Sequence, residues 1–347
     1  MIKNTMGLFA ALSLTATTAF AQANLSAETG PTVSVPGATV LSLAEATGAS
    51  GVANMQVATG QTLTNSVQNV AEGKTDVAAA PFLLTFLLSR GAGPYAALGK
   101  EKGAELADNL AVLYTYRFGT YALSAYESKN FGGWDAIEGA TLYNGPPRGA
   151  ALSRARALVQ LTTGLEDGNG YTGMQVNWDQ AVKTMTDGTA DAHVLPVNFP
   201  DGRHGQAAAA GALAIYSMPK AAFESEGAQK YMKAPGSTGI TMPITDDLFG
   251  PNIRAVSEDD TFRGIAEVGG EIVQKSMSDD MAYALTKSFL DNIGMFEAKT
   301  PFMPTIWLGE VDPAKTGMCG PIGVKYHPGA VRAWEEAGYS VPDCAKP

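Results

Sequence analysis

The chain has 347 residues, a formal net charge of −10 and 45% hydrophobic residues. This length suffices for one large domain, and we expect it to form two lobes. The acidic balance makes nucleic acid and anionic membranes poor partners, although a binding site for an anion can still be locally basic.

The first 21 residues have the pattern of a secretory signal peptide. Lys3 gives a positive start, Met6 to Ala16 form an apolar core, and Ala19-Phe-Ala21 matches a cleavage site. A membrane anchor is the weaker alternative, because this apolar run is too short to cross a bilayer. We therefore predict residues 1–21 as a leader that is cleaved near Ala21, and a mature protein in the periplasm.

The mature chain opens with a polar stretch, which we expect to be a tether from Asn24 to Gly30. Pro31 to Pro36 alternate in polarity like a strand. The turn Gly37-Ala-Thr39 then leads into an Ala- and Leu-rich helix that ends near Gly48. Thr39, in this turn, is a candidate ligand contact.

Residues 52–81 predict a strand, a helix and a second strand, which form a βαβ unit. Asn54 to Val57 are the first strand, Thr64 to Glu72 have apolar residues at helical spacing, and Asp76 to Ala80 fit a buried parallel strand. Ligands of such sheets bind beyond the carboxyl ends of the strands. The polar residues there are candidate contacts, although the last two could equally be helix caps: Thr59, Gln61, Thr62 and Asn65.

Helices are expected from Phe82 to Ser89 and from Pro94 to Asn109, followed by two strands. These strands, Leu110–Tyr116 and Thr120–Tyr126, would form a hinge at which the chain crosses to a second lobe. Tyr116 and Arg117 are candidate contacts near that hinge. The predicted division is residues 22–117 for the first lobe, 118–217 for the second, and 218–347 mainly for a return to the first, including the extended pieces at 238–242 and 254–256.

In the second lobe, the strand Ala140–Tyr143 runs through a Gly- and Pro-rich turn into a helix. This geometry directs backbone N–H groups at an anion. The planar guanidinium of Arg148 could bind a carboxylate through two parallel hydrogen bonds, although Arg148 could also be a solvated residue of the first helical turn. We name Asn144, Arg148 and Gly149 as candidate contacts here, with Asn198 at the end of the next strand.

The only two cysteines of the chain, Cys319 and Cys344, are expected to form a disulfide in an oxidising compartment. Two free thiols, or a metal site, are the alternatives. The three histidines have no metal-ligand spacing, and the motifs of serine hydrolases and nucleotide-binding enzymes are missing from the sequence. We predict no metal, no cofactor and no enzymatic activity.

Three stretches of the chain resemble the TAXI class of periplasmic solute-binding proteins, which serve TRAP transporters. The first is Gly60 to Pro81, and the second is Asn144 to Leu165 followed by Val182 to Ala192. The third is the tail, with Ser278 to Lys287, His327-Pro-Gly-Ala330 and Glu335-Glu-Ala-Gly338. The turn Pro146-Pro-Arg-Gly149 departs from the Gly-Ser-Gly usual in that class.

This resemblance implies an α/β, two-lobed type II periplasmic-binding-protein fold, with a central, mostly parallel sheet flanked by helices in each lobe. It also implies a small organic anion, typically a carboxylate, as ligand, and TRAP membrane permease subunits as partners of a monomer. The alternatives are an ABC-type binding protein for a neutral or sulfonated solute, an exported enzyme that reuses the fold, and a partner of a membrane sensor.

Overall fold

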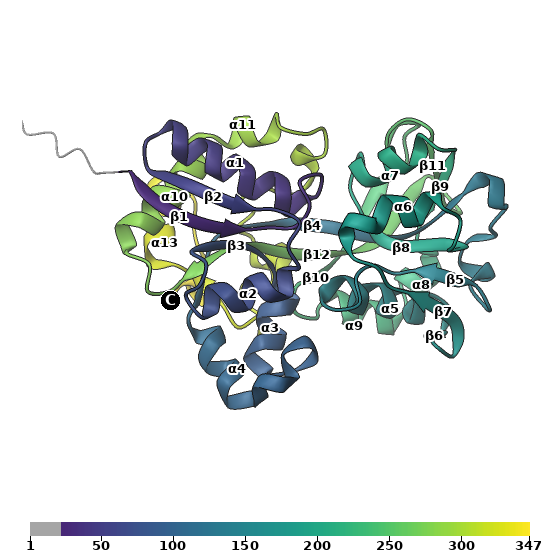
Figure 1. Cartoon of the computed structure of the whole chain (residues 1–347), viewed down its shortest axis with the longest axis horizontal. Coiled ribbons are helices and arrows are strands. Elements are labelled where there is room, and N and C mark those ends of the chain that lie inside the picture. The colour runs from purple at the N-terminus through teal and green to yellow at the C-terminus, as the bar shows by residue number, and fades with distance from the viewer. Residues whose placement is uncertain (1–21) are drawn as a thin grey trace, which may run out of the picture.

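The computed structural model describes residues 22–347, so the predicted leader and its cleavage site lie outside the described residues. Figure 1 shows two lobes, each with a curled sheet and flanking helices, joined by two long strands. The strands follow the order β2-β1-β3-β12-β4-β8-β5-β7-β6. This is the predicted mixed α/β fold.

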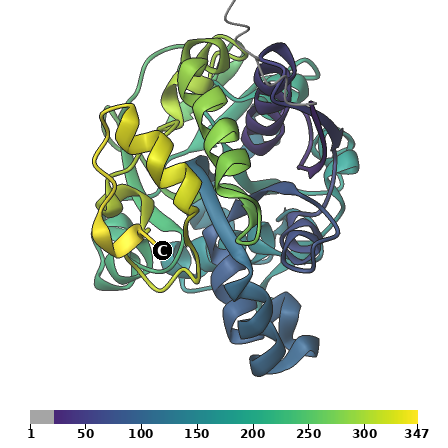
Figure 2. The same cartoon turned by 90° about the vertical axis from the view of Figure 1, so that its left-hand side faces the viewer.

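Lobe 1, built around the largest hydrophobic cluster, has a parallel arrangement of strands. β1 (Ala23–Glu28) lies between β2 (Ala53–Ala58) and β3 (Val77–Pro81). In Figure 1, helices lie on both sides of these strands, and Figure 2 shows the last helix beside α10. The helices of this lobe are α1 (Val35–Ala49), α2 (Leu63–Ala71), α3 (Phe82–Arg90), α4 (Gly99–Asp108), α10 (Asp279–Asp291), α11 (Ile293–Glu297), α12 (Pro313–Thr316) and α13 (Pro328–Glu336). Short elements complete it: η1 (Gly93–Leu98), η5 (Met303–Thr305), β13 (Lys325–Tyr326) and η6 (Asp343–Ala345).

The N-terminal prediction is wrong at two places. The predicted tether contains β1, and the predicted strand at 31–36 is instead a turn that leads into α1. Ser34 caps α1, since its hydroxyl accepts a hydrogen bond from Gly37 N–H, and Pro36 fits the first helical turn. The polar side chains of β1 find partners far along the chain: Ser26 bonds Asp76, and Glu28 accepts from Asn69.

Two antiparallel strands, β4 (Leu110–Tyr126) and β12 (Thr261–Gln274), connect the lobes. β4 is one continuous buried strand where two were predicted, so the crossing near Arg117 occurs within an extended backbone. The register of the pair shifts between Glu267 and Val268, opposite Gly119 and Arg117, which leaves Phe118 as an extra residue. This irregularity is a β-bulge, a feature that bends a strand and redirects side chains.

Lobe 2 has two hydrophobic clusters of its own. Its strands are β5 (Thr141–Tyr143), β6 (Glu166–Asp167), β7 (Gly170–Met174), β8 (Ala192–Val197), β9 (Leu213–Tyr216), β10 (Ser237–Pro243) and β11 (Ile253–Val256). Its helices are η2 (Glu127–Lys129), η3 (Gly133–Ala136), α5 (Ala150–Thr163), η4 (Trp178–Gln180), α6 (Ala181–Thr186), α7 (Gly202–Ala208), α8 (Lys220–Phe223) and α9 (Glu226–Met232).

The expectation that the extended pieces at 238–242 and 254–256 return to the first lobe is wrong. β10 pairs with residues 261–267 of β12, and β11 pairs with β9. The physical reason is hydrophobic: Ile240 and Ile253 are buried in a cluster of lobe 2. The chain therefore returns to lobe 1 along β12.

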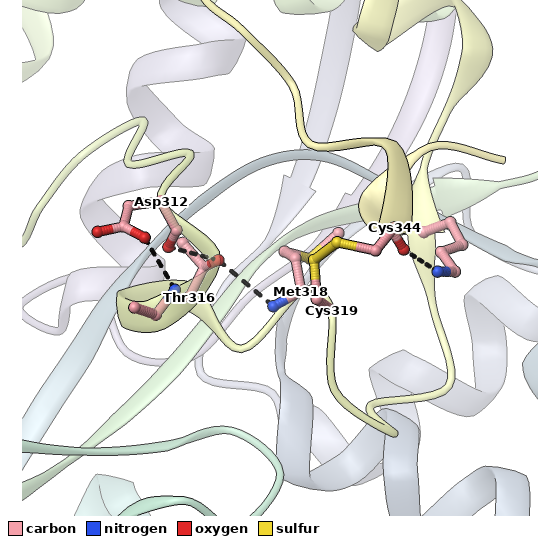
Figure 3. The surroundings of a disulfide bond; sticks show 7 residues. Asp312, Thr316, Met318, Cys319 and Cys344 are labelled. Carbon is pink, nitrogen blue, oxygen red and sulfur yellow. Dashed lines mark hydrogen bonds between the residues drawn. A yellow bond between two sulfur atoms is a disulfide. The ribbon is translucent and has the colours of Figure 1, made fainter.

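The predicted disulfide between Cys319 and Cys344 is present, with the two Cα atoms 5.2 Å apart. Figure 3 shows it beside the helical turn of Asp312 and Thr316. It joins the segment after α12 to the C-terminal residues that follow α13. Over residues 22–347, no helix is long and apolar enough to cross a membrane.

Candidate functional site

A cleft of about 800 Å³, including its open mouth, lies between the two lobes. Its first wall comes from lobe 1, at the start of α1, the start of α2 and the end of β3. The second wall comes from lobe 2, at the start of α5 and the segment after β8. Phe118 and Tyr121 of β4 and Glu267 of β12 also line it. The connecting strands thus form one side of the cleft, so a molecule bound there would contact both lobes.

Three helix N-termini open onto this cleft, at Ser34 of α1, Thr62 of α2 and Gly149 of α5. The side chain of Thr62 makes no capping hydrogen bond, and Gly149 has no side chain to cap α5. The backbone N–H groups of the first helical turn have no partner within the helix and carry partial positive charge. Together these helices favour a negatively charged group in the cleft.

Arg203 is the decisive side chain. It is only 8% exposed, it lines the cleft, and its guanidinium lies 4.4 Å from the centre of the Trp178 ring. No residue within 22–347 accepts a hydrogen bond from its side chain or pairs with it in a salt bridge. A buried guanidinium with free donors strongly favours an anion as its partner.

Asp201 holds the segment that carries Arg203. Its carboxylate accepts hydrogen bonds from Asn198 N–H, His204 N–H and the Nδ1 atom of His204, at 2.7–2.9 Å. Burial alone would raise the pKa of Asp201, but the neighbouring His204 and Arg203 hold it below its ordinary value. Both carboxylate oxygens of Asp201 are therefore already hydrogen-bonded within the protein, and these bonds fix the start of α7.

Glu267 is the other carboxyl group of the cleft and is 5% exposed. Its Oε1 atom lies 3.5 Å from Nε of the buried Arg154, an ion pair without a hydrogen bond. Burial raises the pKa of Glu267, although Arg154 acts in the opposite direction. The cleft therefore contains opposite charges, with Arg148 and Arg203 on one side and Glu267 on the connecting strands.

Four of the predicted contacts line the cleft: Thr62, Arg148, Gly149 and Asn198. Arg148 is exposed, whereas Asn198 is buried. Gly149 lies so close to lobe 1 that an added Cβ would approach Thr64 Oγ1 to 2.7 Å. The local pattern of strand, turn and helix was enough to find these residues.

The other predicted contacts do not line the cleft. Three of them are exposed on lobe 1: Thr59, Gln61 and Asn65. The side chain of Gln61 donates a hydrogen bond to the carbonyl oxygen of Thr59, within the same turn. Four are buried among partners of their own: Thr39, Tyr116, Arg117 and Asn144. The hydroxyl group of Tyr116 donates a hydrogen bond to Glu271, and Thr39 also adjoins Glu271. Arg117 donates hydrogen bonds to Thr120 and Thr305. Asn144 accepts a hydrogen bond from Gln175.

The sequence reasoning missed Arg203, Trp178 and Glu267. A signal for Arg203 existed, since Asp201 follows a strand and can cap a helix whose first turn contains the arginine. A signal for Glu267 was its charge within a largely apolar strand.

A chain of hydrogen-bonding groups links Asp201, His204 and Ser124, with 3.0 Å between His204 Nε2 and Ser124 Oγ. These are the residue types of a hydrolase triad. Here, however, Ser124 and His204 are fully buried, so a substrate cannot reach the hydroxyl. Over residues 22–347, no group of three or more His, Cys, Asp or Glu side chains could hold a metal ion.

A family model described as the NMT1-like family matches residues 26–338. The chain belongs to the NMT1-like family. A search among curated proteins finds no match for it. A protein from Bordetella bronchiseptica RB50 has a similar structure, with a TM-score of 0.55, 13% identity, and coverage of 91% of this chain and 98% of that one. This similarity shows that the NMT1-like protein shares that fold.

Two weaker structural matches are a TRAP periplasmic solute-binding protein from Shewanella oneidensis with bound succinate and a TctC solute-binding protein from Polaromonas. The first has a TM-score of 0.46 and 10% identity, and covers 91% of this NMT1-like chain and 92% of its own. The second has a TM-score of 0.44 and 13% identity, with coverage of 89% and 98%.

Proposed function

We propose that this NMT1-like protein is an extracytoplasmic solute receptor. It binds a small organic anion, a carboxylate, in the cleft between its lobes and delivers it to a TRAP-type membrane permease. The protein acts in the periplasm, without a cofactor and without turnover of its ligand. Arg203 carries this proposal, because a buried guanidinium with free donors faces the cleft.

The binding groups come from both lobes. On lobe 2, Arg203 and Arg148 supply positive charge, and the N-terminus of α5 at Gly149 supplies backbone donors. On lobe 1, Thr62 offers a hydroxyl that is not used as a helix cap. Since an anion that touches both walls interacts better with the closed arrangement than with an open one, binding favours closure.

The connecting strands support this mechanism. Among residues 22–347, only β4 and β12 run through both lobes. Small changes in their backbone angles can move one lobe relative to the other. The resemblance to TAXI-class proteins supports a TRAP permease as the partner. Carboxylate is favoured as the ligand group because a guanidinium matches its two oxygens with parallel N–H donors.

A thermal-shift screen of the purified protein, preceded by mass spectrometry of any ligand released on denaturation, tests the proposal. The screen includes carboxylates, sulfonates and neutral solutes. A ligand that binds only the folded state raises the melting temperature by mass action. We expect carboxylates to give the largest shifts. Shifts by neutral solutes alone would contradict the proposal, shifts by sulfonates alone would favour an ABC-type receptor, and conversion of a bound ligand would indicate an enzyme.

A further inference from the structure

The Oε1 atom of Glu267 is buried and makes no hydrogen bond within residues 22–347, although the Tyr121 hydroxyl adjoins the carboxyl group and acts to lower its pKa. Its carboxyl group belongs to the strand that connects the lobes and lines the cleft. Arg154 is the nearest cation, but the 3.5 Å approach of Nε to Oε1 is too long and poorly directed for a hydrogen bond, and neither atom has another partner within residues 22–347.

Arg154 is held by other groups. Its two terminal nitrogens donate to the carbonyl oxygens of Pro235 and Gly236 and to the hydroxyl of Ser237. Its guanidinium also lies 5.3 Å from the centre of the Tyr231 ring. Arg154 therefore offsets part of the charge of Glu267 but leaves its Oε1 atom without a hydrogen bond. A buried carboxylate oxygen without a hydrogen bond lowers the stability of the folded protein unless another molecule supplies a donor.

The backbone around Glu267 is irregular on the same side of the cleft. The β4–β12 ladder loses register at Glu267, and the extra residue on the facing strand is Phe118, which also lines the cleft. Bulges are frequent beside binding and active sites because they redirect side chains. The local geometry therefore supports a role for Glu267 toward the contents of the cleft.

From these observations, and resting on the proposed function, we infer that the ligand carries an N–H donor in addition to its anionic group, and that Glu267 accepts from it. The anion faces Arg203 and Arg148, while an ammonium or another N–H group faces Glu267. Asp201 cannot take this role because its oxygens are committed to His204 and Asn198. The ligand class is thus an amino acid or a related nitrogen-bearing carboxylate, and the cleft discriminates against the same carboxylate without the nitrogen.

Matched ligand pairs test this inference by calorimetry on the wild-type protein. The pairs are L-glutamate with glutarate, L-leucine with 4-methylpentanoate, and L-phenylalanine with 3-phenylpropanoate. For each pair that binds, we expect the nitrogen-bearing member to bind about 10- to 100-fold more tightly, as expected for a charge-assisted hydrogen bond. Equal affinity within the pairs, or binding only by anions without an N–H donor, would overturn the inference and leave the proposed function intact. If no organic anion binds at all, the proposed function fails, and the inference with it.

The variant E267Q tests the residue. Glutamine preserves the shape of the side chain but removes its charge, so we expect the preference within each pair to fall to about threefold or less. E127Q is the matched control, since it removes the same charge from an exposed pair with Arg254. A preference that persists in E267Q would overturn the assignment. If E267Q does not fold because Arg154 loses its partner, the wild-type pairs still decide whether the ligand carries the donor.

Discussion

Glu271 is a carboxyl group fully buried in lobe 1, where the hydroxyl groups of Tyr114 and Tyr116 donate to its two oxygens. Burial raises its pKa to about 7 from an ordinary value of 4.5, although these hydrogen bonds act in the opposite direction. Because the folded state then holds this proton at pH values where the unfolded chain has lost it, the free energy of unfolding falls as the pH rises from about 4.5 to about 7.

We predict that E271Q reduces the loss of stability between pH 5 and pH 8. Glutamine does not titrate, and the contribution of Glu271 to that loss is roughly 3 kcal/mol at most. Urea unfolding at the two pH values measures it. E336Q is the control, because Glu336 accepts a hydrogen bond from Tyr283 on the surface. The same pH dependence in E271Q and the wild type would show that burial of Glu271 does not set it.

At the scale of elements, the start of α5 is where lobe 2 approaches lobe 1. Gly149 has a φ of 100° and precedes the helix. A side chain there would meet Thr64 of α2. Gly164, at the other end of α5, has a φ of 77° and open space around it. A substitution at either glycine would strain the backbone, because both have a positive φ. Only Gly149 lies between the lobes.

We predict that G164A lowers the free energy of unfolding by about 1–2 kcal/mol, the cost of a left-handed alanine. G149A should lower it by about 1–3 kcal/mol, because a φ of 100° with a ψ of −167° lies in a region open essentially only to glycine. Only G149A should also weaken ligand binding, by about tenfold or more, because its methyl group opposes the closed arrangement. Calorimetry and urea unfolding of both variants separate the two effects. Equal affinity in G149A and G164A would argue that closure does not bring these helices together.

The elements also show what the sequence can reveal. The unit at residues 52–81 was predicted because its periodicity, turn glycine and apolar strand are local properties. β1 was missed because Ser26 and Glu28 look polar until Asp76 and Asn69, far along the chain, bond to them. In the cleft, Arg148 and Gly149 follow from a local turn, whereas the roles of Arg203 and Glu267 depend on neighbours brought together only by folding.

At the scale of the whole molecule, the disulfide stabilises lobe 1 away from the cleft. Cys319 and Cys344 are separated by 25 residues in the sequence, and neither lines the cleft. Closing a loop of this length restricts the unfolded chain and contributes roughly 3 kcal/mol.

We therefore predict that the double variant C319S/C344S loses roughly 3 kcal/mol of unfolding free energy in urea. It should bind ligand with wild-type affinity at a temperature where it remains folded, because the two connecting strands and both walls of the cleft are unchanged. A large loss of affinity in the folded variant would mean that the C-terminal segment takes part in binding.

Calorimetry of R203Q tests the central claim, that an anion is bound by Arg203 between the lobes. The titrant is the carboxylate that gives the wild type its largest thermal shift. R332Q is the matched control: its guanidinium also lies over an aromatic ring, 4.3 Å from the centre of Tyr283, but on the surface beside Asp280. We predict that R203Q binds about 10- to 100-fold more weakly, because a charge-assisted hydrogen bond is lost, while R332Q binds like the wild type. Wild-type affinity in a folded R203Q variant would contradict the account.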